Sequence, residues 1–449
     1  MSILDENIPS QWISRSLGSM GEFFGGVTSI TKEDYGYGTP FLPFKNVFNN
    51  SKVDINALEL MNIKEKDLIK RNCTYGDIFF TASSETDDEV AMSSVLLDNV
   101  KSLTYNGFCK RYRLHSFNEL NPNFVRYFFR SKVFRGLIKQ VVTGDVRFNI
   151  SQETLSNLKI SIPENIKEQK AIAKVLTAFD DKIELLQAQN KTLETMAQTI
   201  FAAWFGKYQM GDELPEGWRV AKFNEFVKSS IGGDYGKETI EGDYTEETIC
   251  LRGTDLPDMK MGTPKKAPIR FLKASKLERC KLENGDIVVE ISGGTENQST
   301  GRAMYINEKI LSSANHPMTC VNFCRIIRPL KLEYSYFLHS LFDYLYTRKV
   351  FFNWENGTTG IKNLNLKALL EDFDLFIPKN EDSILDFNKS VKAVFNKIQT
   401  NNSQIQTLTK TRDTLLPKLM SGQVRVKDRI DTRIGKGLKN KRSPKAAKV

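Results

Sequence analysis

The chain has 449 residues, of which 40% are apolar and 26% are charged, a composition typical of a soluble globular protein with two or more domains. Its longest wholly apolar run, residues 200–205, is much shorter than the ~20 residues that span a bilayer. The N-terminal residues lack the basic and apolar regions of a signal peptide. We therefore expect a cytoplasmic protein without a membrane span.

The formal net charge is +10, but residues 425–449 hold ten Lys or Arg and two Asp, so +8 lies in this segment and +2 in the rest. We expect a disordered basic tail that is either simply solvated or binds phosphate without sequence preference. Six dispersed cysteines and three histidines predict neither a disulfide framework nor a metal site.

Residues 1–163 mix short β-like runs with turn residues and predict an α+β domain. The expected strands are residues 77–81 and 95–97, and an amphipathic helix is expected over 122–140. The helix start at 121–124 is similar to the catalytic loop of amino-methyltransferases. Its third residue differs, however, and no glycine-rich cofactor motif precedes it, so an ordinary helix start is favoured.

Residues 164–206 show a different pattern, with apolar residues spaced alternately four and three apart. This heptad pattern predicts a long coiled-coil helix, with Asn190 and Ala197 at its two remaining core positions. The apolar positions are Ile172, Leu176, Phe179, Ile183, Leu186, Leu193, Ile200 and Trp204.

Residues 207–424 repeat this organisation. The turn and strand of residues 75–79 return at 284–288, an offset of 209, and the segment before Trp12 returns before Trp218, an offset of 206. We expect strands at 286–292 and 303–306, a helix at 334–351, and a second heptad helix at 379–424 that contains Asn401 and Arg412. A repeat of roughly 210 residues is large enough to bury its own core, which a repeat of a solenoid is not.

The two heptad helices are expected to pair with each other. When repeated units pair through equivalent helices about a two-fold axis perpendicular to those helices, the helices run in opposite directions. The pair should therefore be antiparallel. Residues 172–204 would span ~50 Å. The pair could set a distance between the domains, or serve only stability or dimerisation.

The sequence shows no catalytic residues. It contains neither a GxxxxGK[ST] phosphate loop nor a GxGxxG motif after a strand. His339 falls inside the predicted helix of residues 334–351, where a core or surface role is expected.

The loops instead carry polar residues suited to reading base edges and phosphates. Such residues are common in any exposed loop, so this signal alone is weak. The candidate DNA-binding residues are Lys45, Asn46, Thr81, Ser83, Arg147, Arg252, Thr254, Ser292, Gln298, Arg302, Lys362 and Asn363.

Several motifs together resemble the specificity subunits of type I restriction-modification systems, over the whole chain apart from the tail. They are the duplicated layout, LRGTDL at 251–256, NGDIV at 284–288 with SGG at 292–294 and GR at 301–302, FAAWF at 201–205, and LLPKLMSG at 415–422. The last string is the most specific, because proline near the end of a heptad helix followed by a glycine stop is rare. The first copy lacks the RGTD string and the double glycine, so its target should differ.

The resemblance implies two target-recognition domains, each reading one half of a bipartite, asymmetric site in double-stranded DNA. The helices would fix the spacer and dock two modification subunits, which use S-adenosylmethionine on adenine. Two ATP-driven translocase-nuclease subunits would be further partners, with ATP and Mg²⁺, so no cofactor or metal is expected in this chain. The residues expected to face partners are Phe201, Trp204, Phe205, Leu416 and Leu419.

The fold class expected is therefore α+β, with two target-recognition domains in tandem pseudo-repeat and an antiparallel coiled coil. The expected segments are a first domain at 1–163, a first helix at 164–206, a second domain at 207–378, a second helix at 379–424 and a basic tail at 425–449. Two alternatives stay open: a coiled-coil structural or regulatory protein without DNA specificity, and a self-sufficient nucleic-acid enzyme with unrecognised motifs.

Overall fold

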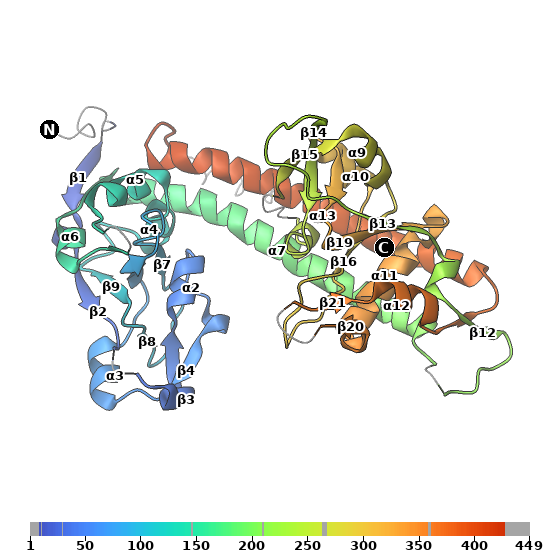
Figure 1. The fold of residues 1–449 in the computed structure, drawn as a ribbon. Coiled ribbons are helices and arrows are strands. Elements are labelled where there is room, and N and C mark those ends of the chain that lie inside the picture. The colour runs from blue at the N-terminus through green and yellow to red at the C-terminus, as the bar shows by residue number, and fades with distance from the viewer. Residues whose placement is uncertain are drawn as a thin grey trace, which may run out of the picture. The chain divides into compact units, whose positions relative to one another are not determined.

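The computed structural model of the chain describes residues 9, 11–28, 30–144, 147–208, 211–262, 267–357 and 361–426 (Figure 1). Its contacts divide the chain into two compact units, the first made of residues 1–181 and 410–449 and the second of residues 182–409. Nearly all of the predicted basic tail, from residue 427 onward, lies outside the described residues. None of the described helices is long and apolar enough to cross a membrane.

The first unit contains a four-stranded antiparallel sheet and a three-stranded sheet. The four-stranded sheet has the order β2 (Gly21–Gly25), β9 (Cys109–Leu114), β5 (Ile78–Thr81), β7 (Ser93–Val95), and the three-stranded sheet the order β4 (Glu59–Met61), β3 (Tyr35–Leu42), β8 (Thr104–Tyr105). Two further pairs are β1 (Trp12–Ser16) with β11 (Lys159–Pro163) and β6 (Ser83–Ser84) with β10 (Phe148–Asn149). The short helices are α1 (Leu17–Met20), α2 (Phe44–Asn49), α3 (Glu65–Arg71), α4 (Pro122–Phe128), α5 (Lys132–Val141) and α6 (Gln152–Asn157).

The second unit repeats these sheets with the same strand order. The four-stranded sheet is β13 (Val227–Gly232), β19 (Cys324–Pro329), β16 (Ile287–Glu290), β17 (Ala303–Tyr305), and the three-stranded sheet is β15 (Ile269–Lys273), β14 (Tyr244–Leu251), β18 (Met318–Cys320). The pairs are β12 (Trp218–Ala221) with β22 (Leu375–Pro378) and β20 (Glu355–Asn356) with β21 (Asn363–Leu364). The short helices are α8 (Leu256–Lys260), α9 (Ala274–Cys280), α10 (Glu308–Ser313), α11 (Ser335–Thr347) and α12 (Leu366–Asp372).

The register of the strands confirms the tandem repeat. Ile78 of β5 lies opposite Tyr112 of β9, and Ile287 of β16 lies opposite Ile327 of β19. Each three-stranded sheet also combines one antiparallel neighbour with one parallel neighbour of its central strand, β3 or β14. Two copies of one α+β domain are therefore present.

Two predicted helices differ from the observed ones. The helix expected over 122–140 is two helices, α4 and α5, because the Ser131 side chain accepts a hydrogen bond from the Phe134 amide and starts a new helix. The helix expected over 334–351 ends at Thr347 and is followed by the 3₁₀ turn Val350–Trp354. The strand expected at 95–97 ends at Val95.

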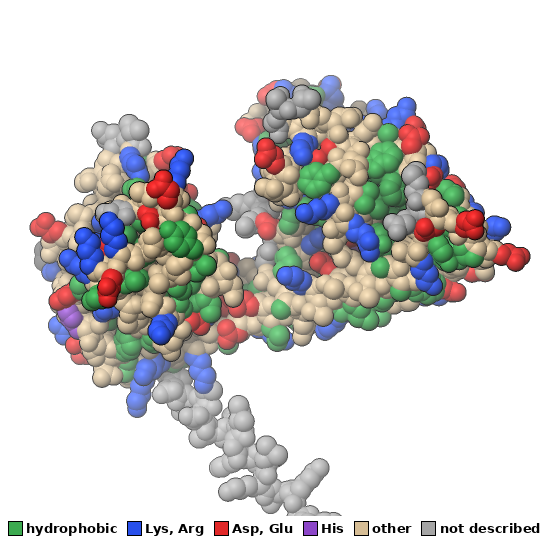
Figure 2. Space-filling model, turned by 90° about the horizontal axis from the view of Figure 1, so that it is seen from below, with side chains coloured by type: hydrophobic (Ala, Val, Ile, Leu, Met, Phe, Trp, Pro, Cys, Tyr) green, Lys and Arg blue, Asp and Glu red, His purple; other side chains and the backbone are tan. Residues whose placement is uncertain are grey.

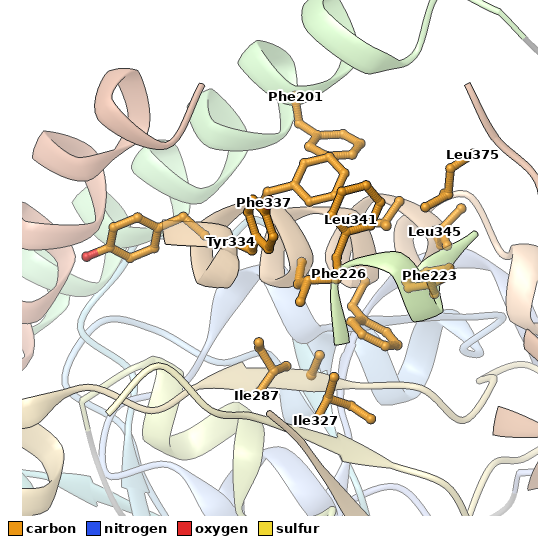
Figure 3. Packing of buried hydrophobic residues seen from close by; sticks show 14 of the residues in the cluster. Phe201, Phe223, Phe226, Ile287, Ile327, Tyr334, Phe337, Leu341, Leu345 and Leu375 are labelled. Atoms are coloured by element: carbon orange, nitrogen blue, oxygen red, sulfur yellow. The ribbon is translucent and has the colours of Figure 1, made fainter. Parts of the chain in front are cut away.

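Helices cover one face of each four-stranded sheet and form its main core. In the second unit, Ile287 and Ile327 of the sheet face Phe337 and Leu341 of α11, with Phe201 of the long helix α7 on the far side (Figure 3). Burial of one such side chain stabilises the fold by about 1.5–3 kcal/mol relative to its exposure. The long helices therefore form part of each domain core.

The long helices α7 (Ile166–Phe205) and α13 (Asp382–Met420) are antiparallel. In the first unit, Asp180 of α7 bonds Arg412 of α13 at 2.8 Å, and in the second unit the Phe201 ring lies 5.6 Å from the Phe387 ring. Residue numbers therefore rise along one helix as they fall along the other. The antiparallel direction predicted from symmetry is confirmed.

Asparagines interrupt the apolar seam at the centre of the pair. The Asn190 amide donates to the Asn402 side-chain oxygen at 2.6 Å, and the Asn401 amide donates to the Asn190 oxygen at 2.9 Å. Asn190 and Asn401 are fully buried. A buried asparagine pair favours the one register in which its polar groups are bonded.

Candidate nucleic-acid interface

Four of the predicted residues of the second domain meet at one end of its four-stranded sheet. Beyond the end of β16, Ser292 forms a β-bridge with Asn363. The Gly293 amide donates to the Lys362 carbonyl at 3.1 Å, and the Glu290 amide donates to the Arg302 carbonyl at 2.9 Å. One cluster therefore contains residues that lie up to 71 positions apart in sequence, namely Ser292, Arg302, Lys362 and Asn363.

Glu290 is the buried anchor of this cluster. Its carboxylate accepts a hydrogen bond from Arg302 Nε at 2.7 Å and a second one from Arg302 Nη2, which raises the pKa of the Arg302 guanidinium. A Cβ at Gly253 would lie 2.5 Å from the same carboxylate, so only glycine allows the loop after β14 to approach it. The loop that carries Arg252 and Thr254 is thereby held beside Arg302.

The side chains of the loop after β14 and of the turn that carries Gln298 differ in how far they are exposed. Arg252 donates to the buried Asp255 carboxylate from Nε at 3.0 Å and from Nη2 at 2.8 Å, with 44% of the side chain still exposed. Thr254 and Gln298 are exposed, and the turn that carries Gln298 is closed by a 2.7 Å bond from the Thr295 amide to the Gln298 carbonyl. This end of the sheet thus combines fixed guanidinium groups with exposed hydroxyl and amide groups, which suit base edges.

The first domain has a corresponding cluster. Ser83 lies opposite Asn149 in the pairing of β6 with β10, at the place where Ser292 meets Asn363 in the second domain. Arg147 is exposed, and its Nη2 donates to Ser83 Oγ at 3.2 Å. Lys45 is exposed at the start of α2. Ser83 and Arg147 are therefore brought together, as Ser292 and Asn363 are.

Asn46 and Thr81 are buried, contrary to our expectation, and Ser83 is also buried, with 7% of its surface exposed. The Asn46 amide donates to the carbonyls of Asp54 at 2.9 Å and Ala57 at 3.2 Å, and its oxygen accepts from the Asp54 amide. Thr81 is fully buried, and its Oγ1 accepts from the Met92 amide at 3.0 Å. Both side chains satisfy backbone groups of neighbouring loops. Local sequence cannot reveal this, because their partners lie 8 to 11 residues away.

The residues expected to face partners are also more buried than predicted. Phe201 and Phe205 are 2% and 7% exposed, because their rings pack against α11 and α13 inside the second domain. Leu419 is 2% exposed in the core of the first unit. Only Trp204 and Leu416 are partly exposed. A heptad pattern predicts an apolar helix face but does not show that the chain's own domain covers it.

His339 is buried in α11, and burial lowers its pKa to about 4, so it is neutral at pH 7. The described residues contain no group of three or more His, Cys, Asp or Glu side chains placed to hold a metal ion. Figure 2 shows one face of the molecule, where basic side chains are interspersed with acidic ones. Any DNA contact on this face would therefore depend on local groups of residues.

The fold and these loops define a tandem two-domain binding protein, in which equivalent strand ends of both domains carry polar clusters. Residues 9–195 match the family model described as the type I restriction modification DNA specificity domain. Known relatives extend the similarity to the rest of the chain. The type I restriction enzyme MjaIX specificity subunit of Methanocaldococcus jannaschii is 25% identical over 442 residues, which cover 94% of this chain and 95% of that protein.

Two further comparisons agree. The type I restriction enzyme HindI specificity subunit of Haemophilus influenzae is 24% identical over 329 residues, 61% of this chain and 71% of that protein. The crystal structure of a type I restriction-modification S subunit from M. genitalium has a TM-score of 0.52 and 18% identity, covering 93% of this chain and 97% of that one. The chain is therefore similar to type I restriction-modification specificity subunits, the family that its motifs resemble, and residues 9–195 match the model of that family's DNA specificity domain. The predicted fold class is confirmed as well.

Proposed function

We propose that the chain is the sequence-specific DNA-recognition subunit of a type I restriction-modification complex, in which each domain reads one half of a bipartite site. The observation that carries this proposal is the recurrence of one polar cluster in both domains. Ser83 meets Asn149 in the first domain, and Ser292 meets Asn363 in the second, at equivalent ends of equivalent sheets. The match of residues 9–195 to a DNA specificity domain supports the same function.

The two halves of the proposed site differ in sequence. Counting from the paired ends of β3 and β14, Lys45 of the first domain corresponds to Thr254 of the second. In the described part of the first domain, the ion pair of Arg302 with Glu290 has no counterpart, because Thr81 occupies the strand position that corresponds to Glu290. Different side chains at equivalent places would contact different bases. An asymmetric site follows.

Catalysis belongs to partner subunits in this proposal. Specificity subunits are in general non-catalytic. The proposed partners are two modification subunits that use S-adenosylmethionine on adenine, and two restriction subunits that use ATP and Mg²⁺. Their docking surface would include the partly exposed Trp204 and Leu416. Because the proposed substrate is the cell's own DNA, the proposed place of action is the cytoplasm.

The proposed division of labour follows the predicted segments. Residues 1–163 and 207–378 would read the two half-sites, and residues 164–206 and 379–424 would set the spacer. Replacing residues 1–163 by the equivalent segment of another family member should change one half-site only. Sequencing of methylated bases in cells that express the chimera with the modification subunit would measure this.

Two outcomes would contradict the proposal. A chimera with both half-sites altered would show that the domains do not read independently. If the unaltered chain supported methylation without any sequence preference, the alternative of a coiled-coil structural protein would be favoured instead.

A further inference from the structure

One cationic position recurs in the two domains at the same point of the four-stranded sheet. Arg325 of β19 lies opposite Gly232, the last residue of β13. Lys110 of β9 lies opposite Gly25, the last residue of β2. The glycine beside each cation carries no side chain to cover it. The repeat has thus kept a positive charge at this place although the residue type differs.

Neither cation has a partner in the described part of the chain. Lys110 and Arg325 are both half-buried, yet no carboxylate oxygen lies within 4.0 Å of either charge and neither side chain makes a hydrogen bond to a described residue. Withdrawing a charge from water without pairing it costs free energy, so fold stability does not explain these residues. Three residues further along the same two strands, Arg113 is bonded to the buried Asp77 and Arg328 to the buried Asp286.

The surroundings of Arg325 suit an anion. Its side chain lines two cavities of about 560 and 470 Å³, and Ser230 lines both of them, so the cavities adjoin. Hydroxyl and cationic groups predominate among their polar lining, with one carboxylate. These groups are Ser229, Ser230, Lys276, Arg279 and Lys367, and the carboxylate is Glu371. Hydroxyl donors together with cations are the usual ligands of phosphate oxygens.

The position also fits the proposed interface. β13 ends at Gly232 and β16 ends at Glu290, while β19 begins beside Arg325 and β17 begins beside Arg302. In this antiparallel sheet, all four points lie at the same end. Arg325 therefore stands at the end of the sheet that carries the cluster of Ser292 and Asn363.

We propose that Arg325 and Lys110 are matched contacts to the DNA backbone phosphates, one in each domain. This inference rests on the proposed function and assigns part of the same interface. Phosphate contacts carry no sequence information, but they fix the position of a protein on the duplex so that nearby loops can read bases. Each domain would be held in place by its own cation while its loops provide specificity.

The test uses the full chain in complex with its modification subunit, one duplex that contains the methylated site, and one duplex with scrambled half-sites. Binding is measured over a range of KCl concentrations. Because each phosphate contact contributes about −0.9 to the slope of log K against log salt, Arg325→Gln should reduce that slope by about 0.9 and weaken binding to both duplexes about fivefold at 0.15 M salt. Lys110→Gln should reduce the slope of log K against log salt by the same amount, and the double variant should reduce it by about twice as much.

Lys309→Gln is the control, since it removes an exposed charge from α10 and should leave the slope nearly unchanged. Arg325→Lys should keep the slope, because the charge remains. If Arg325→Gln left the slope of log K against log salt unchanged, the proposal would be overturned. This holds even if the variant changed the methylated sequence or lowered the midpoint of unfolding. If the unaltered complex bound both duplexes equally while Arg325→Gln still lowered the slope, the proposed function would fail and the phosphate contact would stand.

Discussion

At the scale of single residues, the proposed interface contains two kinds of polar side chain that look alike in sequence. Arg302 is tied to Glu290, whose side chain is 3% exposed, whereas Gln298 is exposed on its turn. Removing one member of a buried ion pair leaves an uncompensated charge, which typically costs about 3–5 kcal/mol. Removing an exposed side chain costs little stability. Substitution by alanine therefore tests stability at Arg302 and recognition at Gln298.

We expect Gln298→Ala to lower discrimination at the second half-site with little change in stability, because the side chain is exposed on its turn. Arg302→Ala should lower the free energy of unfolding by about 3 kcal/mol, since Glu290 stays buried without its partner. Urea unfolding and methylation mapping of the two variants would check this. Equal losses of stability in both variants would contradict the distinction.

A second prediction concerns pH. Burial lowers the pKa of His339 to about 4 from an ordinary value of 6.5. As pH falls, the imidazole binds its proton in the unfolded chain before it does so in the folded chain. The contribution of neutral His339 to the free energy of unfolding is therefore fully present above pH 6.5 and is lost as pH falls from about 6.5 to 4. His339→Phe, which keeps the ring beside Phe395, should reduce that loss by about 3 kcal/mol. Unfolding by urea at pH 7 and at pH 4.5 measures it; an identical pH dependence in the variant and the unaltered chain would contradict it.

At the scale of elements, α4, α7 and α13 meet at one buried carboxylate in the first unit. Asp180 Oδ2 accepts from the Tyr127 hydroxyl at 2.7 Å and lies 3.1 Å from Arg126, and Oδ1 accepts from Arg412 at 2.8 Å. In the second unit, a stack of Tyr336 on Phe395 at 4.6 Å joins α11 to α13 instead. The contacts that join the long helices to the short helices of each domain therefore differ in part, although apolar residues of both long helices are buried in both domain cores.

Asp180→Ala should destabilise the first unit by about 3 kcal/mol, because Arg126 and Arg412 would be left partly buried without a shared carboxylate. Asp181→Ala is the matched control, since Asp181 is exposed one residue along the same helix. Urea unfolding of both variants provides the comparison. The network would be unimportant if the two variants unfolded at the same urea concentration.

At the scale of the whole molecule, the sequence predicts the tandem repeat of domains and the elements that have a regular hydrophobic pattern. The strands of residues 77–81 and 286–292 and both heptad helices are found close to their predicted places, because their signals are local. The burial of Asn46 and Phe201 depends on contacts with distant segments, which no local pattern encodes. The equivalence of Lys110 and Arg325 likewise depends on the register of their strands, which local sequence does not encode.

Lengthening α7 tests whether the helix pair sets the spacer. Four residues inserted after Asn190 add about one turn, or ~6 Å, and the unaltered α13 should absorb part of this by shifting register. We expect the spacer to grow by about one base pair of ~3.4 Å, with both half-sites unchanged, because twisting a short duplex to fit a mismatched separation costs energy. Methylation mapping of the variant decides the matter. Full activity with an unchanged spacer would show that the helices connect the domains without measuring distance.

The end of α13 has a consequence for synthesis. The first unit consists of residues 1–181 together with residues from 410 onward, and Leu419 and Met420 lie in the same buried cluster as Ile172 and Leu176. A ribosome makes about 230 residues between these two parts, so the domain that is translated first is the last to be completed. Until the final turns of α13 emerge, the nascent chain presents an unfilled apolar surface to chaperones and proteases. A chain that stopped before residue 410 would therefore lose not only its last helix but the completion of its first domain.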